Sequence, residues 1–222
     1  MKFSNKSGLF IVEQLITAIQ ANKEYLSDID GAVGDGDHGI NMNKGFALAR
    51  EELDNQTMNL SDGLMTISKV LVNKIGGSMG PLYGSLFRGL SVASRISEQI
   101  DKEVMFAMLE KASNNVKQLT TAQVGDKTLI DVLDPAIAAY EQALQQNKSF
   151  IECLDAMTHA SEKGWQSTKD LIAKVGRGSR LGERTVGHLD AGATSCHIIL
   201  NTIAESAMTL LQKQGEQYAT IY

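Results

Sequence analysis

Residues 101–119 read DKEVMFAMLEKASNNVKQL and show most clearly the pattern that recurs along the chain. Apolar side chains return every three or four residues, which places them on one face of an α-helix. Those expected to face inward are Val104, Met108, Leu109, Ala112, Val116 and Leu119. Asp101 precedes the first apolar residue and is of a type that caps helix N-termini. The stretch therefore predicts an amphipathic helix that buries one face.

The same periodicity recurs in seven other segments, which are separated by short polar or glycine-rich stretches. These segments cover approximately residues 9–26, 39–54, 61–75, 81–98, 129–146, 149–174 and 192–213. Ser61 and Ser149 are expected N-caps, and Pro81 stands where a first helical turn tolerates proline. No alternating strand pattern is longer than four residues, so the chain is expected to be all-α. Because no repeat or linker divides it, residues 1–222 are expected to form one domain of eight helices.

Composition narrows the classes of protein to which the chain can belong. Its 222 residues are 43% hydrophobic and carry a net charge of −5, without the basic stripe of a nucleic-acid-binding protein. No apolar run approaches the ~18 residues of a membrane span, and the start MKFSNKSG lacks the apolar stretch of a signal peptide. We therefore expect a soluble, cytoplasmic protein that binds neither nucleic acid nor a membrane. Cys153 and Cys196 lie among apolar residues without a CxxC motif and are expected to be buried free thiols.

The segment around residues 30–39 carries the densest chemistry. Asp30, Asp35 and Asp37 are separated by glycines, which let the backbone bring the three carboxylates together. Such a cluster repels itself unless a cation neutralises it, and a ligand set made only of oxygen favours Mg²⁺ or Ca²⁺. The alternative is that an aspartate here only caps the helix that follows. Because His38 and two nearby asparagines add to the cluster, a metal site is the preferred interpretation.

Two familiar motifs match this segment by spacing but not in context. Gly34, Gly36 and Gly39 follow the dinucleotide-binding pattern, yet no strand precedes them and aspartates stand between them. A calcium-binding loop that starts at Asp35 would need a glutamate where Phe46 stands. Neither motif is therefore accepted.

Two further glycine-rich segments are suited to bind an anion. Residues 76–81 (GGSMGP) lead into an expected helix, so backbone N–H groups and the helix dipole can act on a phosphate. Residues 174–184 carry Arg177, Arg180 and Arg184, which can close over phosphates as a lid. Each segment alone is also compatible with an ordinary surface turn. With a nucleoside diphosphate bound among three aspartates, the charge count favours two divalent metals over one.

Four motifs that contain these residues occur in a fixed order along the chain. They are Asp30-x4-Asp35-x-Asp37-His38-Gly39-x-Asn41-Met42-Asn43, Gly76-Gly77-x-x-Gly80-Pro81-Leu82-x-Gly84, Gly125-Asp126-Lys127-Thr128-x-x-Asp131 and Gly182-Glu183-Arg184-x-x-Gly187-His188-x-Asp190-x-Gly192-Ala193-Thr194-Ser195. Together they resemble the nucleotide-binding L subunit (the DhaL family) of bacterial dihydroxyacetone kinase, over about residues 9–212. For the fold, the resemblance implies a closed antiparallel barrel of eight amphipathic helices with the nucleotide site at one end.

The resemblance also implies roles for individual residues. Asp30, Asp35 and Asp37 correspond to the ligands of two Mg²⁺ ions that hold ADP or ATP. The residues implied to contact or enclose the nucleotide are His38, Gly39, Ile40, Asn41, Ser78, Met79, Thr120, Leu129, Arg177, Asp190, Ala191 and Gly192. No side chain is assigned as a catalytic nucleophile, because transfer from a metal-bound nucleotide needs positioning and charge neutralisation.

The function that the resemblance implies is that of a phosphotransferase subunit. Bound ADP receives a phosphoryl group from a phosphohistidine on the M subunit, a phosphotransferase-system protein, and passes it to dihydroxyacetone on a separate K subunit. The alternatives are an ATP-dependent kinase subunit for a related ketose such as erythrulose, and a nucleotide-binding regulatory module that acts on a transcription factor. A plain metal-binding helical protein would leave the glycine and arginine segments unexplained. Homodimer formation stays open.

Three positions depart from the family pattern. Met79 stands where the family usually has a hydroxyl residue, Arg180 stands at a commonly aromatic position, and Ala191 stands at a common proline. A looser lid would let the nucleotide exchange more easily, which makes free ATP the alternative source of phosphate.

Overall fold

The computed structural model describes residues 1–53 and 58–219, and these residues are largely helical. The α-helices are α1 (Leu9–Ala21), α2 (Lys23–Val33), α3 (His38–Leu53), α4 (Leu60–Lys74), α5 (Met79–Ser94), α6 (Lys102–Lys117), α7 (Ile130–Gln145), α8 (Phe150–Ser167) and α9 (Ala191–Ala219). The 3₁₀ helices η1 (Thr168–Asp170) and η2 (Gly178–Thr185) lie between α8 and α9. A short strand β1 (Phe3–Ser4) pairs antiparallel with β2 (Gln99–Ile100). The prediction of an all-α chain is confirmed.

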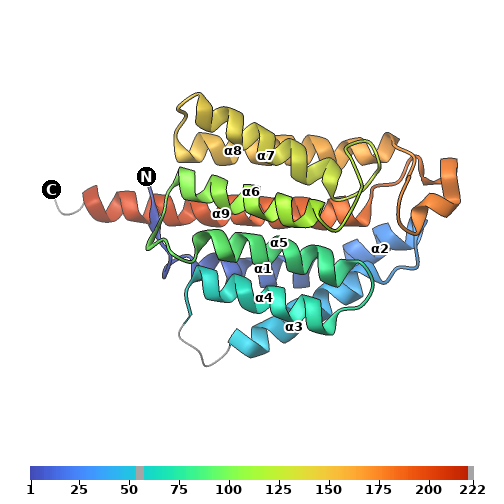
Figure 1. Ribbon diagram of the computed structural model, residues 1–222, viewed down its shortest axis with the longest axis horizontal. Helices are drawn as coiled ribbons and strands as arrows, with labels where there is room; N and C mark the ends of the chain where they lie inside the picture. Colours follow the sequence, from blue (N-terminus) through green and yellow to red (C-terminus); the bar gives the residue numbers. More distant parts are fainter. Residues whose placement is uncertain (54–57, 220–222) are drawn as a thin grey trace.

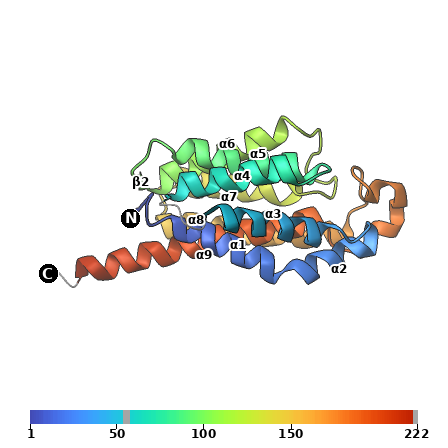
Figure 2. The ribbon, with the colours of Figure 1, turned by 90° about the horizontal axis from the view of Figure 1, so that it is seen from below.

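The helices lie side by side along the longest axis of the molecule (Figure 1). From α3 onward each helix contacts the next one along the chain, and α1 contacts both α3 and α9. α9 spans the length of the body, and its C-terminal end projects past the neighbouring helices (Figure 2). The N-terminus and the C-terminal end of α9 lie at one end of the molecule (Figure 1). The connections from α2 to α3, α4 to α5, α6 to α7 and α8 to α9 all lie at the other end (Figure 1).

Local capping signals set several helix ends. The Asp101 carboxylate accepts a hydrogen bond from the Val104 N–H at 2.9 Å, as the sequence predicted. Ser149 begins α8 through a reciprocal capping box with Glu152, which confirms a second predicted cap. The cap of α4 was predicted wrongly, because Asn59 accepts from the next turn while Ser61 lies inside the helix.

The clearest difference from the sequence prediction lies between residues 22 and 37. The helix expected over residues 9–26 is two helices, which meet at Asn22. The second continues to Val33, through the stretch expected to separate two helices. α2 contacts α3 and α9 and buries Leu26 and Val33 against the body of the protein. These contacts stabilise a helix whose polar composition gives only a weak signal.

A continuous apolar core fills the space between the helices. It includes an edge-to-face contact between Phe46 and Phe87, whose ring centroids lie 5.6 Å apart. Both cysteines are buried free thiols, as predicted. Leu119 is an exception to the predicted inward face, because α6 ends at Lys117 and leaves this side chain exposed.

Among residues 1–53 and 58–219, no helix has the length and apolarity that a bilayer crossing requires.

Candidate functional site

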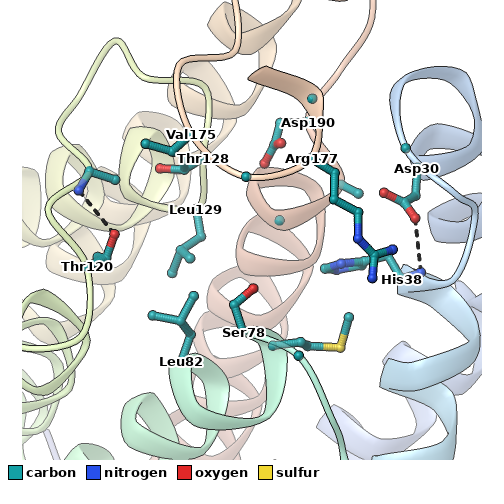
Figure 3. A pocket seen from close by; sticks show the side chains of 18 of the residues that line it. Asp30, His38, Ser78, Leu82, Thr120, Thr128, Leu129, Val175, Arg177 and Asp190 are labelled. Atoms are coloured by element: carbon teal, nitrogen blue, oxygen red, sulfur yellow. Dashed lines mark hydrogen bonds between the residues drawn. The ribbon is translucent and has the colours of Figure 1, made fainter. Parts of the chain in front are cut away.

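A cavity of about 800 Å³ opens where the interhelical connections gather, at the end of the molecule opposite the termini. Its walls come from the end of α2 and the start of α3, the start of α5, the α6–α7 connection, and the chain before and at the start of α9. Figure 3 shows side chains from these separate elements facing a common space. The motif-bearing segments, which lie far apart in the sequence, therefore meet in one place.

Three carboxylates form an acidic cluster at the edge of this cavity. Asp30 lies on the last turn of α2 instead of in a loop, while Asp35 and Asp37 lie in the connection to α3. One carboxylate oxygen of each residue lies within 4.8 Å of those of the other two. Gly36 has a φ of +75°, which glycine adopts without strain and which turns the connection back towards α2.

The electrostatics of the acidic cluster favour a bound cation. Burial raises the pKa of Asp30, and the neighbouring charges of Asp37 and Asp35 raise it further. The backbone N–H of His38 donates to Asp30 Oδ2 at 3.2 Å and partly offsets this rise in pKa. A donor set made only of carboxylate oxygens suits hard divalent cations, so the residues present fit Mg²⁺ or Ca²⁺.

Arg177 supplies the positive charge that faces the acidic cluster. Its guanidinium forms ion pairs with Asp35 and, at 3.4 Å, with Asp37. These two carboxylates raise the pKa of Arg177. A cation bound to the same carboxylates would replace these ion pairs, which would leave the guanidinium available to an anionic ligand.

A hydrogen-bonded chain of side chains holds the His38 ring at the cavity wall. His38 Nε2 lies 2.8 Å from Ser195 Oγ, and Ser195 Oγ lies 2.5 Å from the phenol oxygen of Tyr83. The Tyr83 hydroxyl also donates to the Gly192 carbonyl at 2.8 Å. Burial lowers the pKa of His38 to about 4 and raises that of Tyr83 well above its usual value. The imidazole is therefore neutral and the phenol protonated near pH 7.

The start of α5 directs a helix N-terminus at the cavity. Gly77 has a φ of +69°, and a Cβ on Gly80 would collide with the carbonyl oxygens of Leu71 and Ile75. The hydroxyl of Ser78 makes no capping hydrogen bond and points into the cavity (Figure 3). Because the first N–H groups of a helix have no partner within the helix, this end is suited to bind an anion.

The start of α9 forms a further part of the cavity wall. Asp190 caps α9 by accepting a hydrogen bond from the Ala193 N–H at 2.7 Å. Burial raises the pKa of Asp190 to about 7; the Ala193 N–H opposes this rise and the charge of Asp131 adds to it. The carboxyl group can therefore exchange a proton near neutral pH.

The two sides of the cavity differ in polarity. Asp30, His38 and Arg177 gather on one side in Figure 3. Leu82, Leu129 and Val175 lie on the other side, together with Thr120 and Thr128, and Ser78 lies between the two groups. The cavity can therefore hold an elongated ligand that has one charged end and one less polar end.

Comparison with known proteins places the chain in a family. The sequence model of the DAK2 domain family matches residues 32–205 of the chain. The chain belongs to the DAK2 domain family. This DAK2 protein is 37% identical to the ADP-binding subunit DhaL of PEP-dependent dihydroxyacetone kinase 1 from Listeria innocua, over 86% of this chain and 91% of that subunit. It is 36% identical to the ADP-binding subunit DhaL of PTS-dependent dihydroxyacetone kinase from Lactococcus lactis, over 84% and 90% of the two chains.

A solved structure has the same fold. The crystal structure of the dihydroxyacetone kinase of C. freundii matches this DAK2 protein with a TM-score of 0.63 and 25% sequence identity. The match covers 88% of this chain and 33% of that kinase chain, so the present chain spans about a third of its length. The resemblance to the L subunit, which was inferred from four motifs, is confirmed.

Most of the site residues that the sequence nominated for this DAK2 protein line the cavity. They are Asp30, Asp37, His38, Asn41, Ser78, Met79, Thr120, Leu129, Arg177, Asp190, Ala191 and Gly192. Asp35 belongs to the acidic cluster but not to the cavity lining. Gly39 and Ile40 also lie outside the lining, because Gly39 packs closely on α2 and Ile40 is exposed. Their contact with a ligand stays a prediction.

Several residues of the site were not nominated from the sequence. Tyr83, Ser195 and Thr128 stand inside the quoted motifs, but nothing in their spacing indicates that the first two reach His38. Lys127 was likewise quoted without a role, although the structure buries its side chain. Thr128 and Ser195 could have been predicted as site residues only because each is a hydroxyl residue within a glycine-rich motif.

Proposed function

We propose that this DAK2 protein is the nucleotide-binding L subunit of a dihydroxyacetone kinase, and that it binds ADP and ATP together with Mg²⁺. The observation that carries the proposal is the cavity in which the acidic cluster, the start of α5 and Arg177 face one another. The two DhaL relatives support it, because the chain covers about nine tenths of each. No other segment of the described chain gathers three metal-ligating side chains.

Asp30, Asp35 and Asp37 would hold two Mg²⁺ ions. Two ions are proposed because three carboxylates and a diphosphate carry more negative charge than one ion and Arg177 can offset. When bound, Mg²⁺ would neutralise phosphate oxygens and so lower the electrostatic barrier to attack on phosphorus. The chain's own part is to fix the carboxylates, which the turn at Gly36 and the His38 N–H bond do.

The polarity of the cavity orients the nucleotide. The phosphates would lie beside the acidic cluster, Ser78 and the N-terminus of α5, which supplies N–H donors. The adenine ring would lie between Leu82 and Leu129, where an apolar surface favours a flat ring. Arg177 would turn from the carboxylates to the phosphates as the site fills.

The reaction would need no nucleophile from this chain. A phosphohistidine on the M subunit would give up its phosphoryl group to the β-phosphate oxygen of bound ADP, which breaks a P–N bond and forms a P–O bond. The resulting γ-phosphoryl group would then pass to a hydroxyl of dihydroxyacetone on the K subunit. His38 is neutral and fixed by Ser195, so it suits a hydrogen bond to a phosphate.

The finer description of the fold is also part of the proposal. Residues 1–222 would form one domain in which α1 and α3–α9 close an antiparallel eight-helix barrel, with α2 as an additional helix. Contacts between neighbours from α3 to α9, and from α9 through α1 back to α3, support a closed ring. The nucleotide would sit at one end of this ring.

The test is to identify the nucleotide that the purified protein carries. The supernatant of acid-denatured protein is examined by mass spectrometry, and stripped protein is titrated with ADP with and without Mg²⁺. The proposal predicts bound ADP or ATP, and binding that depends on Mg²⁺. Protein that carries no nucleotide and also fails to bind ADP with Mg²⁺ would contradict it.

A further inference from the structure

The side chain of Lys127 is a buried positive charge to which the proposed function assigns no role. The residue is only 2% exposed, although it belongs to a loop in the α6–α7 connection. A buried ammonium is costly unless all of its N–H groups are bonded. Lys127 Nζ donates to the carbonyl oxygens of Leu171 at 3.1 Å, Thr185 at 2.6 Å and His188 at 2.6 Å. Its three donors therefore have three acceptors.

All three acceptors belong to residues 171–188, which we call the arginine segment because it carries Arg177, Arg180 and Arg184. Its only helical structure is η2, which is interrupted at Gly182, and three of its glycines have positive φ. Within the segment, the Ala173 N–H donates to Thr185 Oγ1 at 3.0 Å and so links its two ends. Leu171 lies at one end of the segment, whereas Thr185 and His188 lie at the other. Lys127 therefore adds three hydrogen bonds from outside the segment to the Ala173–Thr185 bond that joins its two ends.

The rest of the Gly125–Asp131 motif holds Lys127 in place for this task. Asp131 is buried and accepts hydrogen bonds from the Gly125 N–H at 2.6 Å and the Thr128 N–H at 2.7 Å. Lys127 itself has a φ of +62°, which is unfavourable for a residue with a side chain and persists only when its surroundings require it. Next to it, Asp126 binds Lys174 of the arginine segment through an ion pair at 3.0 Å and a backbone hydrogen bond.

We propose that Lys127 is a positioning residue that fastens the base of the arginine segment, so that Arg177 is carried over the polar side of the cavity. The expected effect on nucleotide binding rests on the proposed function, in which Arg177 closes over the nucleotide phosphates. The fastening itself is a property of the chain without ligand. Loss of the ammonium would leave three carbonyl groups without their donor and would weaken the link between the two ends of the segment.

The experiment compares Lys127→Met with a matched control, Lys174→Met. Methionine has nearly the length of lysine but no N–H donor, and Lys174 contacts the same two segments through an exposed ion pair. Hydrogen exchange is measured without nucleotide, and ADP titration with Mg²⁺ follows. In Lys127→Met we expect exchange in residues 171–188 to rise at least about tenfold, with α1 and α3–α6 unchanged, and ADP affinity to fall about tenfold. In Lys174→Met both effects should stay within about twofold.

Unchanged exchange of residues 171–188 in Lys127→Met would overturn the inference. Lys127→Arg is the second variant, because it keeps the charge and several donors in a different geometry. We expect this variant to exchange at a rate between those of the wild type and Lys127→Met. If both variants lose their helical signal, Lys127 serves the whole fold and the inference is also overturned. If the wild type fails to bind ADP, the proposed function fails, whereas the exchange result still decides the role of Lys127.

Discussion

Replacing Asp35 by asparagine is expected to remove most of the stabilisation by ADP and Mg²⁺ and to leave the helical fold intact. The Asp35 side chain is 52% exposed and pairs with Arg177, so its loss removes little from the packing of the protein. The variant also removes one of three clustered like charges, which relieves repulsion in the ligand-free chain. The ligand-free melting temperature should therefore stay the same or rise.

The magnitude follows from linkage between binding and folding. At a nucleotide concentration one hundred times the dissociation constant, binding stabilises the native wild type by about 2.7 kcal/mol. In a chain of this length that corresponds to a rise in melting temperature of roughly 5–10 °C. Loss of a direct metal ligand should weaken binding by about a hundredfold or more. The same ligand concentration then stabilises the variant by only about 0.4 kcal/mol, and its melting temperature should rise by about 1 °C.

The assay is thermal melting of both proteins, with and without Mg²⁺ and ADP. Asp28→Asn is the matched control, because Asp28 is an exposed carboxylate on α2, the helix that carries Asp30, and lies outside the acidic cluster. The control should keep the full rise of the wild type. Equal rises in the wild type and Asp35→Asn would refute the reasoning, since Asp35 would then not be a metal ligand.

Three other substitutions test separate parts of the site. Tyr83→Phe removes one hydroxyl from the hydrogen-bonded side chains that fix His38, and ADP titration should show about fivefold weaker binding. Tyr140→Phe removes a buried hydroxyl far from the cavity and should leave ADP binding unchanged. Ala191→Pro places proline at the first position of α9, so it should slow the release of labelled ADP and raise the free energy of unfolding by about 0.4–1 kcal/mol. Burial raises the pKa of Asp190 to about 7, so the native carboxyl keeps a proton that the unfolded chain releases at lower pH. Because the native state then binds more protons, Asp190 lowers the free energy of unfolding as pH rises from about 4 to about 7. In urea denaturation Asp190→Asn, which can still cap α9, should gain stability relative to the wild type over this range; a constant difference would refute the assignment.

Local signals predicted the features that local interactions determine. The caps at Asp101 and Ser149 were predicted because each carries the oxygen that its own first turn needs. The acidic cluster and the start of α5 were found because closely spaced aspartates and runs of glycine stand out in the sequence. α2 was missed because its stability comes from contacts with α3 and α9, which the sequence of residues 23–33 does not reveal.

Long-range side-chain contacts could not be predicted in the same way. The hydrogen bond between Tyr83 and Ser195 joins residues 112 positions apart, and the reach of Lys127 to Thr185 spans 58 positions. A tyrosine or lysine in a motif has the same appearance in the sequence whether it faces solvent or a buried partner. Only the packing of α5 and α9, and of the α6–α7 connection with the arginine segment, brings these groups together.

The most direct test of the proposed function is phosphoryl transfer in a reconstituted mixture. The mixture contains this chain loaded with ADP and Mg²⁺, a K subunit with dihydroxyacetone, and a large molar excess of M subunit in its phosphohistidine form, without free ATP. The account predicts many equivalents of dihydroxyacetone phosphate per chain, and no product when Asp35→Asn replaces the wild type. The absence of product from a folded, ADP-loaded wild-type chain would contradict it.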